Sequence, residues 1–145
     1  MTQEESLDDR ICYRIKVAQA AVHTRMEEVL RPFDLSVSQY AALELIGRFP
    51  QATNAQLARA AFVTRQSMNT MLQGLQRRGL VDRADRPTSG RELPTVLTPD
   101  GATLLRRASR AVADMESAVA LAFTDDERRA LMDALDRTVT TLRQG

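Results

Sequence analysis

The chain has 145 residues, which is enough for one domain with a sizeable core. Its 20 basic and 19 acidic residues give a formal net charge of +1, so the overall charge points to no particular partner, and one Cys and one His exclude an internal disulfide and a Cys₂His₂ or Cys₄ zinc site. Because no apolar run approaches ~18 residues and no secretory signal is visible, we expect a cytoplasmic protein with no metal, cofactor or membrane partner.

Residues 7–33 carry one apolar stripe, which predicts a long amphipathic helix. Its members recur every three or four positions: Leu7, Ile11, Ile15, Ala18, Val22, Met26, Val29 and Phe33. Pro32 marks the place where this helix ends or kinks. A helix of ~25 residues is about 38 Å long, roughly the diameter of a globule of this chain length. We therefore expect part of the stripe to pack against another chain.

Two short helices follow, and each begins with a capping box, in which a Ser or Thr and a Gln three residues later cap one another's backbone. Ser36 with Gln39 starts the first of these helices, which ends before Pro50. Thr53 with Gln56 starts the second.

A very short break then leads into a fourth helix, as in a helix-turn-helix. Phe62 and Val63 interrupt the third helix. Thr64 can cap a helix from Arg65 to Arg78, and Gly79 occupies the position where a left-handed residue ends a helix.

A two-stranded ribbon is predicted over residues 80–98. Residues 80–83 and 93–97 are typical of short strands, and residues 86–91 are turn material. Pro94 cannot donate a ladder hydrogen bond, so we expect its strand to lie at an edge or to be interrupted.

Two further amphipathic helices complete the chain. Thr98 followed by Pro99 and an acid is a strong helix start, and Thr124 with Glu127 is a third capping box. The first of these helices carries apolar residues as far as Phe123, and the last has a stripe of its own: Leu131, Leu135, Val139 and Leu142. The predicted fold is mainly α (α+β), with three helices, a fourth helix joined to a ribbon, and two long helices.

The fourth helix has two faces with different chemistry. Its apolar face consists of Met68, Met71, Leu72 and Leu75, and its polar face of Arg65, Gln66, Asn69, Thr70, Gln73 and Arg77. Asn and Gln can pair with adenine and Arg with guanine, while free amides at the helix start, beside Thr64 and Ser67, favour a phosphate. The stretch of residues 51–81 contains no acidic side chain. The polar face therefore predicts contacts with the major groove of double-stranded DNA.

The middle of the chain is also its basic part. Residues 54–98 carry 7 basic and 3 acidic side chains, whereas the flanking segments are slightly acidic. Arg83, Arg86 and Arg91 surround the Pro/Ser/Gly tip of the ribbon. A basic loop of this kind can follow the DNA backbone or enter the minor groove. A reading helix followed by a basic ribbon is the winged helix-turn-helix arrangement, which we place at residues 36–98.

Two segments resemble the multiple antibiotic resistance regulator (MarR) family: TRQSMNTMLQGLQRRGLVDR, from Thr64 to Arg83, and SGRELPTVLTPDG, from Ser89 to Gly101. The order of elements is similar to that family from about Leu7 to Leu142. By this resemblance, Arg91 is the wing-tip arginine that reaches a minor groove, and Ser89 stands where the family usually has an Asp.

The resemblance implies a transcriptional regulator, most simply a repressor, that acts as a homodimer on a pseudo-palindromic operator. One domain would then span residues 1–145, with dimerisation helices at residues 7–33 and 99–145. Two reading helices related by a two-fold axis, ~34–36 Å apart, fit successive major grooves.

The resemblance also implies release from DNA by a small aromatic or anionic effector, held between the dimer helices and the helix-turn-helix. Candidate pocket residues come from two helices that we expect to approach one another: His23, Arg25, Met26, Tyr40 and Leu43. His23 or Arg25 could supply positive charge to an anion. The alternative for His23 is an exposed or hydrogen-bonded surface role.

A thiol-based response is the alternative mode of regulation. LDDRICYRI, from Leu7 to Ile15, is similar to the start of the organic hydroperoxide-sensing branch, in which a Cys at this place is oxidised. Arg10 or Arg14 could favour the thiolate of Cys12. The alternative for Cys12 is the role of a small buried apolar residue.

We do not expect an enzyme, because the sequence shows no phosphate-cradling glycine loop, no paired His ligands and no nucleophile with a base. A winged helix can also serve as a protein-interaction module that does not bind DNA. The polar helix face without acids favours nucleic acid over this second alternative.

Overall fold

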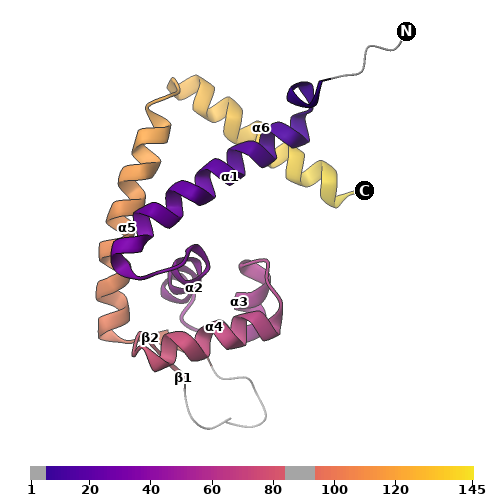
Figure 1. Cartoon of the computed structure of the whole chain (residues 1–145). Helices are drawn as coiled ribbons and strands as arrows, with labels where there is room; N and C mark the ends of the chain where they lie inside the picture. Colours follow the sequence, from indigo (N-terminus) through magenta and orange to yellow (C-terminus); the bar gives the residue numbers. More distant parts are fainter. Residues whose placement is uncertain (1–5, 84–93) are drawn as a thin grey trace.

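The computed structural model describes residues 6–83 and 94–145. Its elements are the 3-10 turn η1 (Leu7–Asp9), α1 (Ile11–Leu30), the 3-10 turn η2 (Arg31–Phe33), α2 (Val37–Arg48), α3 (Asn54–Ala60), α4 (Arg65–Arg77), β1 (Val81–Arg83), β2 (Thr95–Leu97), α5 (Pro99–Ala120) and α6 (Asp125–Arg143). Figure 1 shows α5 rising from the lower part, which holds α2, α3, α4 and the strands, to the upper part, where α6 begins. The predicted mainly α fold with one small sheet is confirmed.

The first helix is shorter than its apolar stripe predicted. α1 spans 20 residues rather than ~25, and 3-10 turns flank it at both ends. Arg10 adopts an extended backbone (φ −87°, ψ 122°), which separates η1 from α1. Pro32 lies in η2, where its missing N–H and fixed φ end the α-helical hydrogen bonding. The end at Pro32 is as predicted, whereas the break at Arg10 was not predicted, because the turn η1 keeps the apolar spacing.

The predicted starts of α2 and α3 are confirmed, because each is fixed by a local capping box. Ser36 Oγ accepts a hydrogen bond from the backbone N–H of Gln39 at 3.0 Å, and Gln39 Oε1 accepts one from the N–H of Ser36 at 3.0 Å. Thr53 and Gln56 repeat this reciprocal arrangement at 3.2 and 2.8 Å. Each box satisfies two backbone donors that a helix start otherwise leaves open.

The third predicted capping box sets the start of α6. The backbone N–H of Thr124 donates to Glu127 Oε1 at 3.0 Å, and Thr124 Oγ1 accepts from the N–H of Glu127 at 3.1 Å. The backbone hydrogen bond, together with the Thr124 hydroxyl, lowers the pKa of the Glu127 carboxyl. The carboxylate also suits the positive end of the helix dipole.

The core lies where α2, α3, α4 and the sheet meet the lower half of α5. The largest fully buried side chains are Leu30, Leu43, Ile46, Leu57, Met68, Leu72, Leu75, Val81 and Thr95. They come from α1, α2, α3, α4 and both strands. The inner face of α4 is therefore packed from several sides, which fixes how its outer face is presented.

The turn between α3 and α4 contains a left-handed residue that is not glycine. Phe62 has φ 59°, and its side chain is 82% exposed. The N–H of Val63 donates to the carbonyl of Ala58 at 3.0 Å and closes the turn. Thr64 then caps α4 by accepting from the N–H of Ser67 at 3.0 Å. At the other end of α4, Gly79 has φ 72°, as predicted.

The two strands pair antiparallel, and β2 packs against α5, which follows it directly in the chain. Val81 pairs with Leu97 and Arg83 with Thr95 in the register of the sheet, while Pro94 comes just before β2 and leaves its ladder intact. Both strands are shorter than predicted. A Cβ on Gly101 would overlap the carbonyl oxygen of Leu80, so α5 and the chain just before β1 approach this closely only because residue 101 is glycine.

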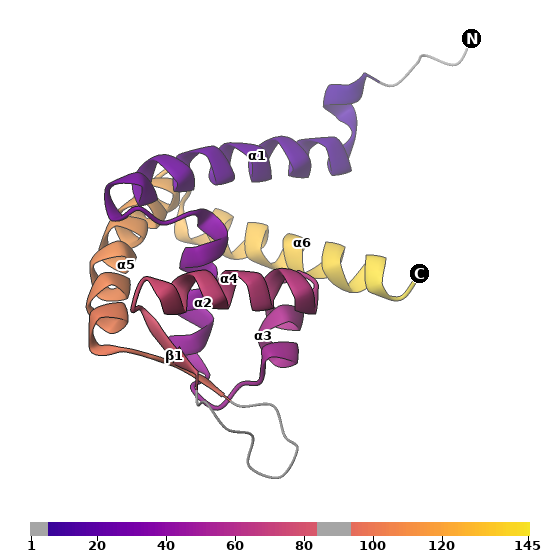
Figure 2. The ribbon, with the colours of Figure 1, turned by 60° about the horizontal axis from the view of Figure 1, so that its bottom comes forward.

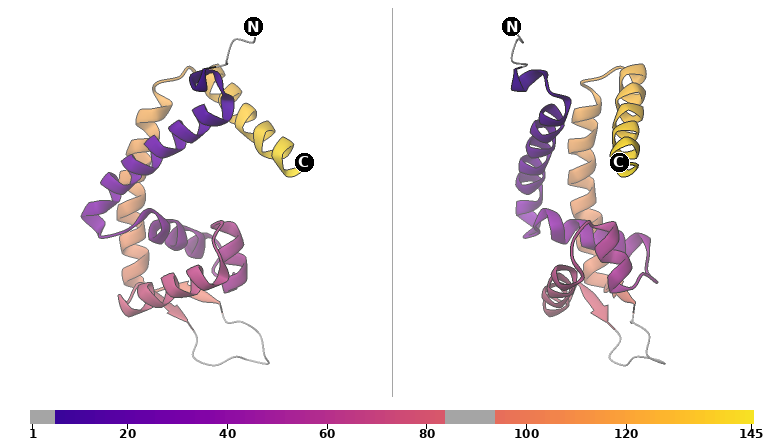
Figure 3. Two further views of the ribbon diagram at one scale, coloured as in Figure 1. Left: turned by 45° about the vertical axis from the view of Figure 1, so that its right-hand side comes forward. Right: turned by 90° about the vertical axis from the view of Figure 1, so that its right-hand side faces the viewer.

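The long helices α1, α5 and α6 do not form a closed bundle within the chain. The right-hand view of Figure 3 shows α1 and α6 on different sides of α5, and Figure 2 shows both helices running away from α5. α1 and α2 pack against α5, but within the described part of the chain no residue of α6 is buried. Among the described residues, no helix combines the length and apolarity needed to span a bilayer.

Candidate nucleic-acid interface

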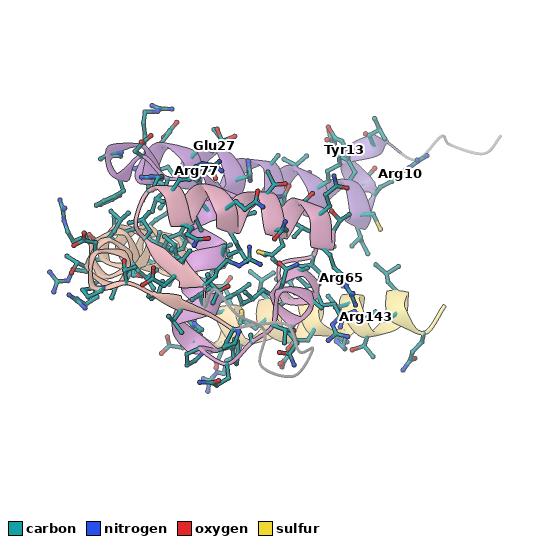
Figure 4. All side chains as sticks on the ribbon, turned by 90° about the horizontal axis from the view of Figure 1, so that it is seen from below. Arg10, Tyr13, Glu27, Arg65, Arg77 and Arg143 are labelled. Carbon is teal, nitrogen blue, oxygen red and sulfur yellow. The ribbon has the colours of Figure 1, made fainter. Side chains whose placement is uncertain are left out.

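The outer face of α4 carries the side chains that the sequence assigned to DNA. Met68, Leu72 and Leu75 are fully buried and Met71 is half-buried, so the apolar face is confirmed as core. On the opposite side, five predicted residues are exposed: Arg65, Gln66, Thr70, Gln73 and Arg77. Figure 4, which views the molecule from below, shows Arg65 and Arg77 at opposite ends of α4. The 12 steps between them span about 18 Å of helix, so the two guanidinium groups bracket the polar face.

The start of α4 combines a filled cap with an exposed cation. The hydroxyl of Thr64 accepts from the backbone of Ser67 and donates to Ser67 Oγ at 2.9 Å. Both residues are exposed, and Arg65 follows Thr64 directly. The remaining amide donors of the first turn and the Arg65 guanidinium together form a site that suits a phosphate group.

Asn69 differs from its neighbours on the polar face because it is half-buried and already bonded. Arg83 Nη1 donates to Asn69 Oδ1 at 2.9 Å, from the end of β1 across to α4. Both residues were predicted to contact DNA separately. The structure brings them together, and no local pattern in the sequence indicated this pairing.

The tip of the wing lies outside the described residues. The predicted contacts Arg86 and Arg91 fall in residues 84–93, as does Ser89. The described base of the wing consists of β1, β2 and the Arg83 side chain, which is half-buried. Of the predicted wing arginines, Arg83 alone therefore has a described position, and it faces α4.

A cavity of about 490 Å³ lies at the junction of α1, η2 and α2. Its lining consists of His23, Glu27, Arg31, Asp34, Leu35, Ser36, Val37, Ser38 and Gln39. His23 Nε2 lies 2.8 Å from Glu27 Oε1 at its rim. Of the five predicted pocket residues, His23 alone lines this cavity. The polar residues of η2 and of the α2 start were not predicted, because their approach to His23 depends on the turn at Pro32.

The other predicted pocket residues lie elsewhere. Arg25 is exposed and pairs with Glu28 at 2.7 Å, and Met26 is half-buried against the core. Leu43 is fully buried. The structure therefore does not bring the five side chains together around one cavity within the chain.

Tyr40 is buried between α2 and α5. Its hydroxyl lies 3.3 Å from Ser109 Oγ, which is hydrogen-bond distance. Burial raises the pKa of the Tyr40 phenol above its ordinary value, so the group is neutral at physiological pH. This contact ties the helix-turn-helix to the long helix α5.

Cys12 is exposed in the first turn of α1, so the core of its own chain does not bury it. Thiol sensing stays a prediction, and a comparison of wild type with Cys12→Ser in peroxide-treated DNA-binding assays tests it.

Apolar side chains remain exposed at the ends of the long helices. On α6 they are Leu131, Met132, Leu135, Val139 and Leu142, and in η1 and α1 they include Leu7, Ile11 and Val22. A groove of about 650 Å³ between the end of α5 and the start of α6 includes Val119 and Phe123. Exposed apolar side chains that recur along a helix in this way are typical of an interface with another chain.

The packed α3–α4 pair, the antiparallel ribbon and the exposed polar face of α4 define a winged helix-turn-helix protein. A model of the MarR family matches residues 33–92. The HTH-type transcriptional repressor Rv2887 of Mycobacterium tuberculosis is 31% identical over 130 residues, which cover 90% of this chain and 94% of the relative. The chain belongs to the MarR family.

Two solved structures extend the comparison. The transcriptional repressor CouR bound to a 23-mer DNA duplex is similar with a TM-score of 0.85 and 26% identity, covering 96% of this chain and 99% of that one. Rv2887 of Mycobacterium tuberculosis in complex with salicylic acid is similar with a TM-score of 0.71 and 29% identity, covering 93% and 98% of the two chains. The similarity thus covers nearly the whole of both chains.

Proposed function

We propose that the protein is a transcriptional repressor that binds a pseudo-palindromic operator in double-stranded DNA as a homodimer. The observation that carries the proposal is the outer face of α4, where arginine, glutamine and threonine side chains are exposed and no acid intervenes. The relatives support it, since Rv2887 is a repressor and CouR was solved on a DNA duplex. A regulator of chromosomal DNA would act in the cytoplasm.

The residues proposed to contact DNA divide by role. Thr64, Arg65 and Ser67 hold a phosphate at the start of α4, while Gln66, Thr70, Gln73 and Arg77 face the bases or the far backbone. Arg86 and Arg91 stay proposals on the basis of the sequence, as does a winged unit at residues 36–98.

The exposed apolar stripes of α1 and α6 support the homodimer. A dimer places two α4 helices against successive major grooves, and one reading helix alone offers too few contacts for tight specificity. The helices from residues 7–33 and 99–145 are the proposed dimerisation elements.

We further propose that a small aromatic acid releases the DNA. The support comes from Rv2887, which was solved with salicylic acid, and from the α1–α2 cavity, where His23 and Arg31 can meet a carboxylate. Salicylic acid titrated into the preformed complex should lower DNA affinity, measured by fluorescence anisotropy. Unchanged affinity at millimolar concentration would contradict this part of the proposal.

The DNA-binding proposal is tested by selecting bound duplexes from a random pool and then measuring the salt dependence of binding. We expect an inverted repeat, and an affinity that falls about 10³-fold or more between 50 and 200 mM salt. Arg65→Ala should reduce the slope of log affinity against log salt concentration, whereas the control Arg129→Ala, on α6, should leave this slope unchanged. A response to salt that is flat in the wild type would contradict DNA binding of this kind.

A further inference from the structure

The contact between Arg83 and Asn69 joins the base of the wing to the middle of the reading helix. The donor–acceptor distance of 2.9 Å is that of a full hydrogen bond, and both side chains are half-buried. We propose that Arg83 is a positioning residue that determines which hydrogen-bonding group Asn69 presents to a base edge, an inference that rests on the proposed DNA-binding function.

The chemistry of the pair fixes the orientation of the amide. A guanidinium has only donors, so the atom of Asn69 that faces Arg83 must be the carbonyl oxygen Oδ1. The amide nitrogen Nδ2 then lies on the other branch of the side chain, with two N–H donors left for other partners. Since a charged donor strengthens the hydrogen bond, the reversed orientation is disfavoured.

This orientation changes what Asn69 can read. An unconstrained Asn pairs with adenine by offering its oxygen to N6 and its nitrogen to N7. Here Oδ1 faces Arg83 on β1 and accepts its hydrogen bond, so the amide presents its two N–H donors away from Arg83. Guanine alone offers two adjacent acceptors, N7 and O6, in the major groove, whereas adenine N7 and thymine O4 are single acceptors and the N4 amino group of cytosine opposes a donor. The structure therefore assigns to Asn69 a preference for guanine at one position of each half-site.

The position of Arg83 in the fold supports a role through Asn69. Its backbone is fixed by β1, where it pairs with Thr95, a buried residue of β2. Asn69 is held on α4 one position after Met68, which is fully buried. Both partners are thus anchored on regular elements, and the orientation of the amide does not depend on a loop.

The test uses selection from a random DNA pool with the full-length protein. In Arg83→Met, the hydrogen bond is lost, and we expect the base preference at one position per half-site to relax about tenfold while other positions keep theirs. Arg83→Lys retains a charged donor and should restore part of the preference. In Asn69→Asp, the side chain still accepts from Arg83 but presents oxygen to the DNA, so the preferred base at that position should change from guanine to cytosine.

The salt dependence of binding separates positioning from direct phosphate contact. If Arg83 acts through Asn69, the slope of log affinity against log salt stays the same in Arg83→Met. A uniform loss of affinity on all sequences, with a slope reduced by about 1 per protomer, would overturn the inference and make Arg83 a phosphate contact. Selected sites that are unchanged in all three variants would overturn it as well. Failure of the wild type to bind any duplex would instead refute the proposed function.

Discussion

Arg78 donates a hydrogen bond of 2.8 Å from Nη1 to the backbone carbonyl of Asp34. Arg78 caps the end of α4, whereas Asp34 lies in the turn before α2, with φ 52°, and lines the α1–α2 cavity. The end of the proposed reading helix is therefore bonded to the wall of the proposed effector site. The Arg78 side chain thus links this turn to α4 in addition to the packing of the core.

Loss of this bond should weaken the fold moderately. We expect Arg78→Met to lower the free energy of unfolding by about 1 kcal/mol, since the carbonyl loses a charged donor while the exposed ion pair to the Asp34 carboxylate adds little. Denaturant titration measures the difference at a fixed protein concentration. Arg77→Met, one position earlier on α4, is the matched control. Equal unfolding midpoints for the two variants would contradict the structural role of Arg78.

Phe62 should be replaceable by glycine with a gain in stability. Its left-handed backbone is unfavourable for a residue with a Cβ, and its exposed ring contributes little packing within the chain. We expect Phe62→Gly to raise the free energy of unfolding by about 1 kcal/mol. Phe62→Ala removes the ring but keeps the Cβ, so it should show no such gain. Identical melting temperatures for the two variants would argue against strain at this turn.

The two glycines at positions 101 and 74 should respond in opposite ways to alanine. Gly101→Ala places a Cβ against the Leu80 carbonyl, and we expect a loss of about 2–4 kcal/mol in the free energy of unfolding as α5 and the chain just before β1 are forced apart. Gly74→Ala meets only the tip of Arg77 and should add up to about 1 kcal/mol through helix propensity. Thermal unfolding of both variants is the measurement. An unchanged melting temperature for Gly101→Ala would contradict the close approach of α5 to the Leu80 carbonyl.

A charge on the apolar side of α6 should dissociate the dimer. Leu135→Glu lies in the exposed stripe, and its carboxylate would be buried at the proposed interface without a partner. We expect a shift to monomer in analytical ultracentrifugation and a loss of operator binding. Thr140→Glu introduces the same charge on another side of α6 and should leave the dimer intact. If Leu135→Glu stays dimeric, the interface does not include this stripe.

The elements that were predictable from the sequence are those set by neighbours along the chain. The capping residues Ser36, Thr53 and Thr124, the break at Phe62 and the left-handed Gly79 all act within a few positions of themselves. Such interactions leave a pattern in the sequence, so the starts of these helices and the two faces of α4 were predicted.

The contacts that were not predictable join distant positions. Asn69 and Arg83 lie 14 residues apart, and Asp34 and Arg78 lie 44 apart. Their pairing depends on how β1 and η2 pack against α4, which periodicity does not reveal. The predicted effector residues were scattered for the same reason, since a helical stripe does not show whether a side chain such as Leu43 lines a cavity or fills the core.

The length and continuity of α5 affect how motion passes along the molecule. α5 is one unbroken helix of 22 residues, and its N-cap Thr98 donates a hydrogen bond of 2.6 Å to the carbonyl of Gly79, in the turn between α4 and β1, while its other end reaches the start of α6. A rod of about 33 Å converts a tilt of roughly 5° at its far extremity into about 3 Å of travel at the ribbon. α5 thus acts as a lever: a small rotation between the subunits can displace each reading helix α4 from the position that matches the major groove.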